Sequence, residues 1–205
     1  MVVDGIYYAL ASIGGGVLVA WLTGQPLTGV PFFVFAAFSL YFFRDPERTI
    51  PEGPMAVSPA DGKVMAVKLE DANTTRVSIF LNVFDVHVNR SPIGGTITDV
   101  YYKKGEFLVA SKEIASTNNE QNVVTVQTTE GVRVMYKQIA GLIARRIVFR
   151  KRVGETVEKG ERIGLMKFGS RMDVLFGPEW RVVVQPGERV VGGTSILAER
   201  VGQRI

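Results

Sequence analysis

Gly169 and Ser170 lie side by side in LMKFGSRMDV (residues 165–174), a segment that otherwise has the pattern of a β-strand, with Lys167 and Arg171 flanking them. Glycine is unfavourable inside a strand because it adds backbone entropy and packs nothing. Gly and Ser are also common turn residues, so a Gly-Ser pair alone most often indicates a turn. The pair therefore predicts either a turn or a place where the backbone itself reacts.

Two further residues could take part in acid–base chemistry. His87 is the only histidine of the chain and lies in DVHVNRSP, beside Asp85 and ahead of a turn signal. Its imidazole titrates near neutrality, although a single histidine on a strand is often a buried structural residue. Asp61 lies in SPADGKV, where Asp-Gly is also a frequent turn pair.

Composition excludes several other kinds of site. The chain has 205 residues, no cysteine and one histidine, so disulfides, thiolate nucleophiles, cysteine-based metal sites and His-rich metal sites are excluded. With 46% hydrophobic and 21% charged residues it can form a packed core. Basic residues cluster in ARRIVFRKR (residues 144–152) without interleaved aromatic residues, so we predict no nucleic-acid partner.

The first part of the chain has the composition of a membrane anchor. No charged residue lies between Asp4 and Arg44, and TGQP divides this stretch into Gly5–Leu22 and Leu27–Phe43. Each part approaches the ~20 residues that a helix needs to cross a bilayer. Residues 1–48 are therefore predicted to form an anchoring helical hairpin at the cell membrane. Arg44 and Arg48 place the domain that follows on the cytoplasmic side.

Residues 49–205 read as a mainly antiparallel β-domain. Short β-branched runs recur between Gly, Pro and Asn residues at hairpin spacing. The segment GETVEKGERI, which starts at Gly154, recurs as GERVVGGTSI from Gly187. This repeat predicts two equivalent β-hairpins that face each other in a sandwich, of the kind found in lipoyl and biotinyl domains.

Several segments in the same order resemble the phosphatidylserine decarboxylase family, especially its short prokaryotic branch, which includes archaetidylserine decarboxylase-like proteins. They are YFFRDPER, VSPADGKV, FLNVFDVHVNRSP, QIAGLIARRIV and MKFGSRMDV, and the resemblance covers most of residues 41–200. It implies an enzyme that removes carbon dioxide from a serine phospholipid to give the ethanolamine phospholipid. The electron sink for this reaction would be a covalent pyruvoyl group made from Ser170.

The resemblance also implies how that group arises. The Ser170 hydroxyl attacks the Gly169 carbonyl, the amide becomes an ester, and β-elimination then divides the chain. The products would be a large chain, 1–169, and a small chain, 170–205, which remain associated. Residue 170 loses ammonia and becomes the pyruvoyl group.

The family pattern assigns roles to the remaining candidates. Asp61 would support self-cleavage, and His87 aligns with the first histidine of the H-x-x-H motif of longer relatives, which is used in decarboxylation. Arg90 occupies the place of the second histidine, which belongs to self-cleavage. Two possibilities follow: His87 serves both steps, or another group activates Ser170. Arg90 and Arg171 are the candidate ligands for the phosphate or carboxylate of the substrate.

Two other readings compete with the decarboxylase. Met166-Lys167 stands where a biotin acceptor would have Met-Lys, so the chain could be a membrane-attached biotinyl or lipoyl carrier modified at Lys167. It could also be a β-module that only binds or scaffolds. An exposed sheet edge would in addition allow a homodimer.

Overall fold

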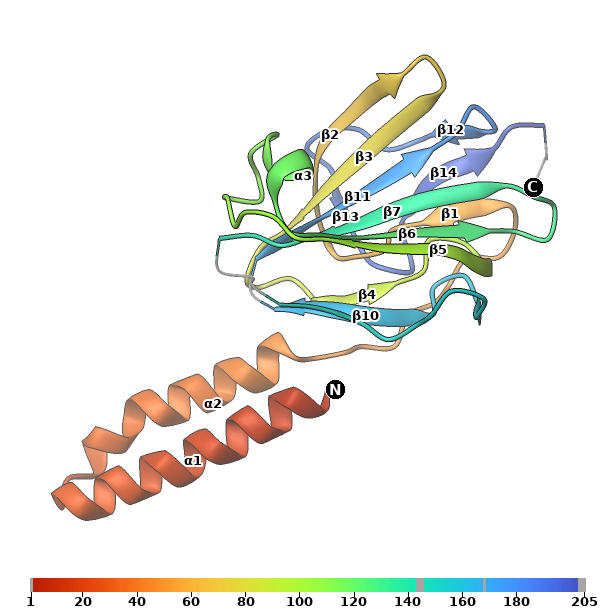
Figure 1. The fold of residues 1–205 in the computed structure, drawn as a ribbon. Helices are drawn as coiled ribbons and strands as arrows, with labels where there is room; N and C mark the ends of the chain where they lie inside the picture. The colour runs from red at the N-terminus through yellow and green to blue at the C-terminus, as the bar shows by residue number, and fades with distance from the viewer. Residues whose placement is uncertain (1, 143–145, 168, 203–205) are drawn as a thin grey trace. The chain divides into compact units, whose positions relative to one another are not determined.

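The computed structural model describes residues 2–142, 146–167 and 169–202. The chain forms two compact units, Met1–Glu47 and Arg48–Ile205, each with its own internal contacts. The predicted order, apolar helices followed by a mainly antiparallel β-domain, is confirmed (Figure 1).

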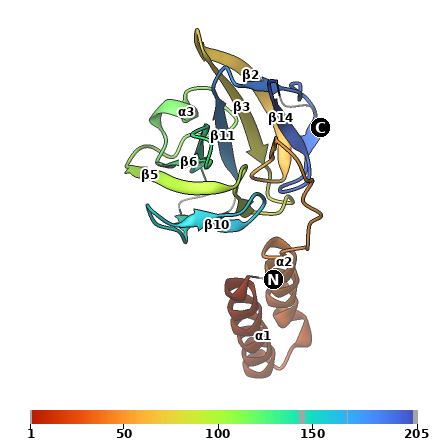
Figure 2. The ribbon, with the colours of Figure 1, turned by 90° about the vertical axis from the view of Figure 1, so that its right-hand side faces the viewer.

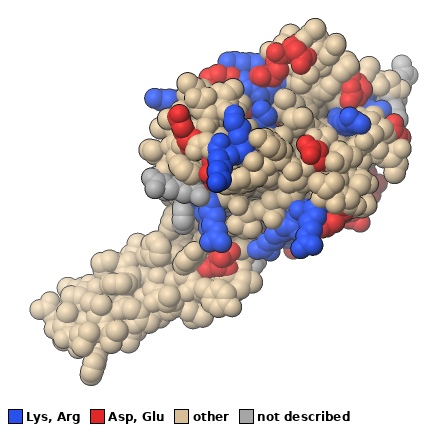
Figure 3. Space-filling model, in the orientation of Figure 1, with Lys and Arg blue, Asp and Glu red and all other residues tan. Residues whose placement is uncertain are grey.

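The first unit is an apolar helical hairpin. Helix α1 (Val3–Thr23) ends at Gly24, and the short helix η1 (Pro26–Gly29) leads into α2 (Val30–Phe42). The backbones of the two arms approach closely at Gly16 and Gly29, where a larger side chain would meet the opposite helix. Helix α1 is long and apolar enough to cross a membrane, whereas the second arm is shorter. Most of the hairpin surface visible in Figure 3 carries neither acidic nor basic side chains.

The second unit is built from three sheets. The largest has eight strands in the order β13-β2-β3-β11-β7-β6-β5-β9, and two three-stranded sheets have the orders β1-β14-β12 and β4-β10-β8. The strands are β1 (Met55–Val57), β2 (Gly62–Asp71), β3 (Thr74–Leu81), β4 (Val88–Arg90), β5 (Gly95–Lys103), β6 (Gln121–Gln127), β7 (Arg133–Ile139), β8 (Arg146–Phe149), β9 (Thr156–Val157), β10 (Arg162–Lys167), β11 (Ser170–Phe176), β12 (Trp180–Val182), β13 (Arg189–Val190) and β14 (Ile196–Arg200). A short helix, α3 (Ala115–Asn118), lies between β5 and β6.

One hydrophobic core lies inside the curl of the large sheet, which Figure 2 shows almost end-on. Alternate residues of a strand point to opposite faces, so Met172, Val174 and Phe176 of β11 all enter this core. The small sheets close it from the other side, with Met166 of β10 and Ala198 of β14 fully buried in the same cluster. The result is a sandwich made by a curled sheet and two small ones.

The repeat found in the sequence forms equivalent turns at opposite edges of the large sheet. Strand β9 of the first copy pairs with β5, and β13 of the second copy pairs with β2. Gly160 and Gly193 occupy matching places with the same φ of 79°, a left-handed conformation that favours glycine. A side chain at either glycine would meet Ile50, so the two turns face each other across this residue.

The equivalence extends beyond the repeat to the whole β-domain. In the large sheet, β13-β2-β3-β11 on one side match β9-β5-β6-β7 on the other, and β11 pairs with β7 at the centre. Two hydrogen bonds are reciprocal: Val57 N–H donates to Pro92 O at 2.9 Å and Arg90 N–H to Pro59 O at 2.8 Å. The domain therefore consists of two similar halves related by an approximate two-fold axis.

The chain passes between these halves at two places that matter below. It leaves the first half after β3, which ends at Leu81, and enters the second at β4, which begins at Val88. It returns after β10, which ends at Lys167, and begins β11 at Ser170. His87 and the Gly169-Ser170 bond therefore belong to the two crossover connections.

Candidate active site

Ser170 is the first residue of β11, opposite Leu81 of β3, and its side chain is fully buried. Its Oγ atom has no hydrogen-bond partner among the residues that the structure describes. Gly169 precedes it with a φ of 69°. Because L side chains rarely adopt this conformation, the residue before Ser170 favours glycine. The predicted turn and the predicted reactive bond therefore coincide: a left-handed glycine leads into a buried serine.

His87 lies beside this connection. Its Nε2 atom accepts a hydrogen bond from the Gly169 N–H at 3.3 Å, and its Nδ1 atom lies 2.9 Å from the carbonyl oxygen of Asp85. An Nε2 that accepts implies a neutral ring with its proton on Nδ1, donated to that carbonyl. Only 2% of His87 is exposed. The structure thus places the single histidine in contact with Gly169, the residue before Ser170.

Asp85 fixes the turn that carries His87. Its carboxylate accepts a hydrogen bond from the Asn82 N–H at 2.9 Å and forms an ion pair with Arg189. The Asp85 carbonyl then orients the imidazole. The sequence signal for this role was the position of Asp85 two residues before the histidine.

Asp61 lies at the turn before β2. Its carboxylate accepts hydrogen bonds from Arg48 Nη2 at 2.9 and 3.1 Å and from the Gly192 N–H at 2.8 Å. These contacts connect the start of the β-domain with the second copy of the repeat. They suit the turn-forming role that Asp-Gly indicated, and the role of Asp61 in self-cleavage stays a prediction.

Arg90 lies on the other face of β4 from the neighbouring Asn89. Its side chain is 6% exposed, and its Nη1 atom donates to the carbonyl oxygen of Gly160 at 2.9 Å. A side chain added at Gly193 would meet the Arg90 side chain. The structure therefore places Arg90 between the two repeat turns.

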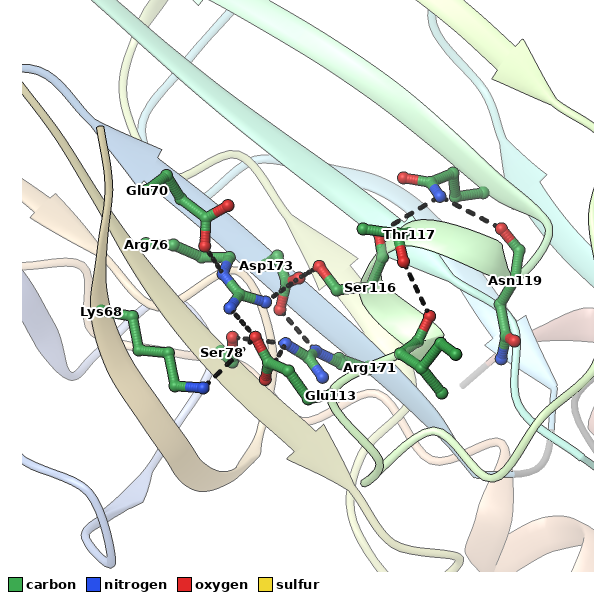
Figure 4. A network of polar contacts seen from close by, with 12 residues as sticks. Lys68, Glu70, Arg76, Ser78, Glu113, Ser116, Thr117, Asn119, Arg171 and Asp173 are labelled. Carbon is green, nitrogen blue, oxygen red and sulfur yellow. Dashed lines mark hydrogen bonds and ion pairs between the residues drawn. The ribbon is translucent and has the colours of Figure 1, made fainter.

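Arg171 also points away from Ser170, because the two are adjacent in β11. It belongs to a buried polar network on the outer face of the large sheet (Figure 4). Its guanidinium donates to Asp173 at 2.6 Å, to Ser78 Oγ at 2.8 Å and to the Lys112 carbonyl at 3.2 Å. The expected use of Arg171 as a substrate ligand receives no support from this position.

The same network contains a second buried arginine, Arg76. It forms ion pairs with Glu70 at 2.6 Å, with Asp173 at 3.2 Å and with Glu113. Burial disfavours its charged form, but the hydrogen bonds and charges of Glu113 and Asp173 outweigh burial and raise the pKa of Arg76. Burial likewise opposes ionisation of Glu113, yet Arg76 and Arg171 lower the pKa of this carboxyl overall. The network joins Arg171 and Asp173 of β11 to Arg76 of β3 and to Glu113.

Lys167 bears on the carrier hypothesis. It is the last residue of β10, pairs with Arg146 of β8, and is only 7% exposed. Enzymatic attachment of biotin or lipoate requires a lysine accessible at a hairpin turn. The burial of Lys167 within a strand disfavours this reading.

Sequence reasoning did not identify four residues of this region. Asn89, Gln138 and Asn122 form a chain of side-chain hydrogen bonds. Gly141 also lies against the Gly169 carbonyl, because a side chain at this position would overlap that oxygen. Asn89, Gln138 and Gly141 lie in the segments DVHVNRSP and QIAGLIARRIV, but no local pattern distinguished them, and Asn122 lies in neither segment.

Comparison with known proteins agrees with this geometry. Residues 35–198 match the family model for phosphatidylserine decarboxylase. The phosphatidylserine decarboxylase proenzyme of Solibacter usitatus is 64% identical over 204 residues, which cover 100% of this chain and 98% of that protein. The proenzyme of Syntrophus aciditrophicus is 44% identical, covering 87% and 84%, and that of Neisseria gonorrhoeae is 41% identical, covering 91% and 75%. A buried serine after a left-handed glycine, with the only histidine against that glycine, thus occurs in a chain that belongs to the phosphatidylserine decarboxylase family.

Proposed function

We propose that this protein cleaves itself between Gly169 and Ser170 and then decarboxylates a serine phospholipid, either phosphatidylserine or archaetidylserine, to the ethanolamine phospholipid. The observation that carries the proposal is the contact of His87 Nε2 with Gly169, next to a buried Ser170 hydroxyl that lacks a partner. Both candidate substrates share the phosphoserine headgroup, and the proposal concerns this headgroup.

Self-cleavage uses groups of the chain itself. His87 Nε2 takes the Ser170 hydroxyl proton while Oγ attacks the Gly169 carbonyl carbon, and the peptide bond rearranges to an ester with a free amine on residue 170. Loss of the Cα proton of residue 170 expels the Gly169 carboxylate and leaves a double bond in residue 170. Tautomerisation and addition of water then release ammonia and leave a ketone. The fully buried Ser170 side chain supports this course, because bulk water would otherwise hydrolyse the ester.

The resulting pyruvoyl group would accept the electrons that carbon dioxide leaves behind on Cα of the headgroup. The residues around position 170 suit such a group, since the core face of β11 offers a closed apolar wall at Met172. His87 lies where it can return a proton to the substrate after carbon dioxide has left. The outer-face network, which contains Arg171 and Asp173, would keep the small chain bound to the large chain after division.

The hairpin supports a place at the cell membrane. We infer that residues 1–48 anchor the enzyme and that the β-domain lies on the cytoplasmic side, as Arg44 at the end of the apolar stretch indicates. Arg48 contributes less to this argument than expected, because its side chain is paired with Asp61. Association of two chains into a homodimer stays a prediction.

Intact-mass measurement tests the proposal. The purified wild-type chain should consist of two fragments divided before residue 170, with the small fragment carrying a blocked, pyruvoyl N-terminus. Ser170→Ala should give one uncut chain without decarboxylase activity, whereas the exposed-strand control Thr98→Ala should divide normally. Two fragments from Ser170→Ala would refute self-cleavage at this bond. One wild-type chain heavier by biotin or lipoate would support the carrier instead.

A further inference from the structure

Three buried carboxamides form a hydrogen-bonded chain across the interior. Asn122 Nδ2 donates to Gln138 Oε1 at 3.1 Å, and Gln138 Nε2 donates to Asn89 Oδ1 at 2.9 Å. Asn122 is 3% exposed and the other two are fully buried. The chain leaves one group over: Asn89 Nδ2 is buried and has no hydrogen-bond partner among the described residues.

The position of this amide connects it with the reacting bond. Asn89 lies in β4, two residues after His87, which precedes the strand. Gln138, which holds Asn89, lies opposite Met172 on β7. Met172 in turn shares the inner face of β11 with Ser170, two residues earlier. Asn89 is therefore connected through Gln138 to the strand that begins with Ser170.

A buried donor without a partner destabilises a protein, because it has lost its hydrogen bonds to water. Such groups are rare in native proteins, and each calls for an explanation such as a catalytic or binding role. The amide nitrogen can only donate, so its partner must be an acceptor, which a bound ligand can supply. Ser170 Oγ is another buried polar atom without a partner among the described residues, and under the proposed function it takes part in the reaction.

We propose that Asn89 Nδ2 binds the carboxylate of the serine headgroup, an inference that rests on the proposed function. When the headgroup amine reaches residue 170, the carboxylate on the same carbon comes with it and supplies two acceptor oxygens. The two arginines that the sequence offered for this task, Arg90 and Arg171, are both placed on other faces.

A neutral donor is also better suited to the reaction than a guanidinium. The carboxylate loses its charge as it becomes carbon dioxide, so a cation would stabilise the bound substrate more than the transition state and slow the step. An amide N–H orients the carboxylate with a weaker interaction. The Gln138–Asn122 chain fixes the Asn89 side chain from behind, which reduces the entropy lost when the carboxylate binds.

The test compares two lipids in the full-length, self-cleaved enzyme. Asn89→Asp keeps the Oδ1 acceptor for Gln138 but replaces the donor by an oxygen that repels a carboxylate, and Asn89→Ala removes both. We expect each variant to lose at least about tenfold in kcat/KM for the serine phospholipid. Inhibition by the ethanolamine phospholipid, which lacks the carboxylate, should remain within about twofold of the wild type or become stronger for Asn89→Asp.

Gln121→Ala is the matched control, because it removes a carboxamide that is also 3% exposed but donates to the Asn119 carbonyl, outside the chain of three. It should divide normally and leave the ratio of the two lipid affinities unchanged. Equal loss of both lipids in the Asn89 variants would overturn the inference, and so would failure of both variants to fold or to divide. An undivided wild-type chain would instead refute the proposed function itself, so the two failures are distinguishable by mass before any kinetics are measured.

Discussion

The Nε2 lone pair of His87 can accept a hydrogen bond from only one group at a time. In the uncleaved chain it accepts the Gly169 N–H at 3.3 Å, a long hydrogen bond by the usual geometry. To act as a base it must release this N–H and accept the Ser170 hydroxyl instead. Because the existing contact is weak, little free energy is lost when it breaks. The Asp85 carbonyl keeps the proton of the ring on Nδ1 throughout.

Substitution of His87 tests this account. His87→Ala should leave most of the chain undivided, because it removes the base, whereas His87→Gln can still accept the Gly169 N–H but cannot take a proton. We expect both variants to accumulate as full-length chain, measured on denaturing gels over time. If His87 serves decarboxylation alone, both should divide promptly and turn over ~10² to 10⁴-fold more slowly. Full decarboxylase activity in a divided variant would remove His87 from the mechanism.

Some residues of the candidate site could be predicted from the sequence, whereas the positions of others depend on the register of the strands. Ser170, Gly169 and His87 are unusual in type and place, and the sequence sufficed to connect them. The substrate-binding roles of Arg90 and Arg171 stay predictions, because such a role depends on which face of a strand each side chain occupies. A shift of one residue reverses that face, and the sequence alone did not fix the register here.

The position of the candidate active site follows from the two similar halves of the β-domain. The two crossovers between the similar halves bring His87 and Ser170 together, although 82 residues separate His87 from Gly169. The repeated GE-x-V segment predicted equivalent turns, and the matching φ of Gly160 and Gly193 agrees with that prediction. The wider two-fold relation was not predictable, because its halves share strand order rather than residues.

Gly141, in the connection after β7, supplies a prediction at this scale. Its backbone conformation would accept alanine, but an added Cβ would overlap the Gly169 oxygen and lie 3.2 Å from Ala110 Cβ. Gly141→Ala should therefore displace the scissile carbonyl and slow self-cleavage by at least about tenfold, on the order of 1.4 kcal/mol in the barrier. The rate can be followed as the loss of full-length chain after synthesis in vitro.

Gly94→Ala is the control for this substitution. Gly94 also has an ordinary backbone conformation, and a Cβ there would meet nothing closer than 3.4 Å. This variant should divide at the wild-type rate. Equal rates of self-cleavage for the wild type and Gly141→Ala would show that the position of the Gly169 carbonyl does not depend on the absence of a side chain at Gly141.

For the whole molecule, the decisive property is the division into two compact units, Met1–Glu47 and Arg48–Ile205. Strands β1 to β14, the hydrophobic core and the residues of the site all belong to the second unit. The change from an uncharged apolar stretch to short β-branched runs made this organisation readable from composition. The ion pair of Arg48 with Asp61 was not readable, because it joins residues through the fold.

This division predicts that chemistry and membrane attachment can be separated. Deletion of residues 1–43 keeps Arg48 and its bond to Asp61, so the remaining domain should fold and divide before residue 170. It should decarboxylate a short-chain, soluble serine phospholipid at a rate close to that of the full chain. On vesicles its activity should fall at least about tenfold, because burial of the apolar hairpin in the bilayer no longer holds the enzyme at its substrate. A folded domain that fails to divide would mean that the hairpin helps to build the site, and undiminished activity on vesicles would mean that the β-domain binds lipid surfaces by itself.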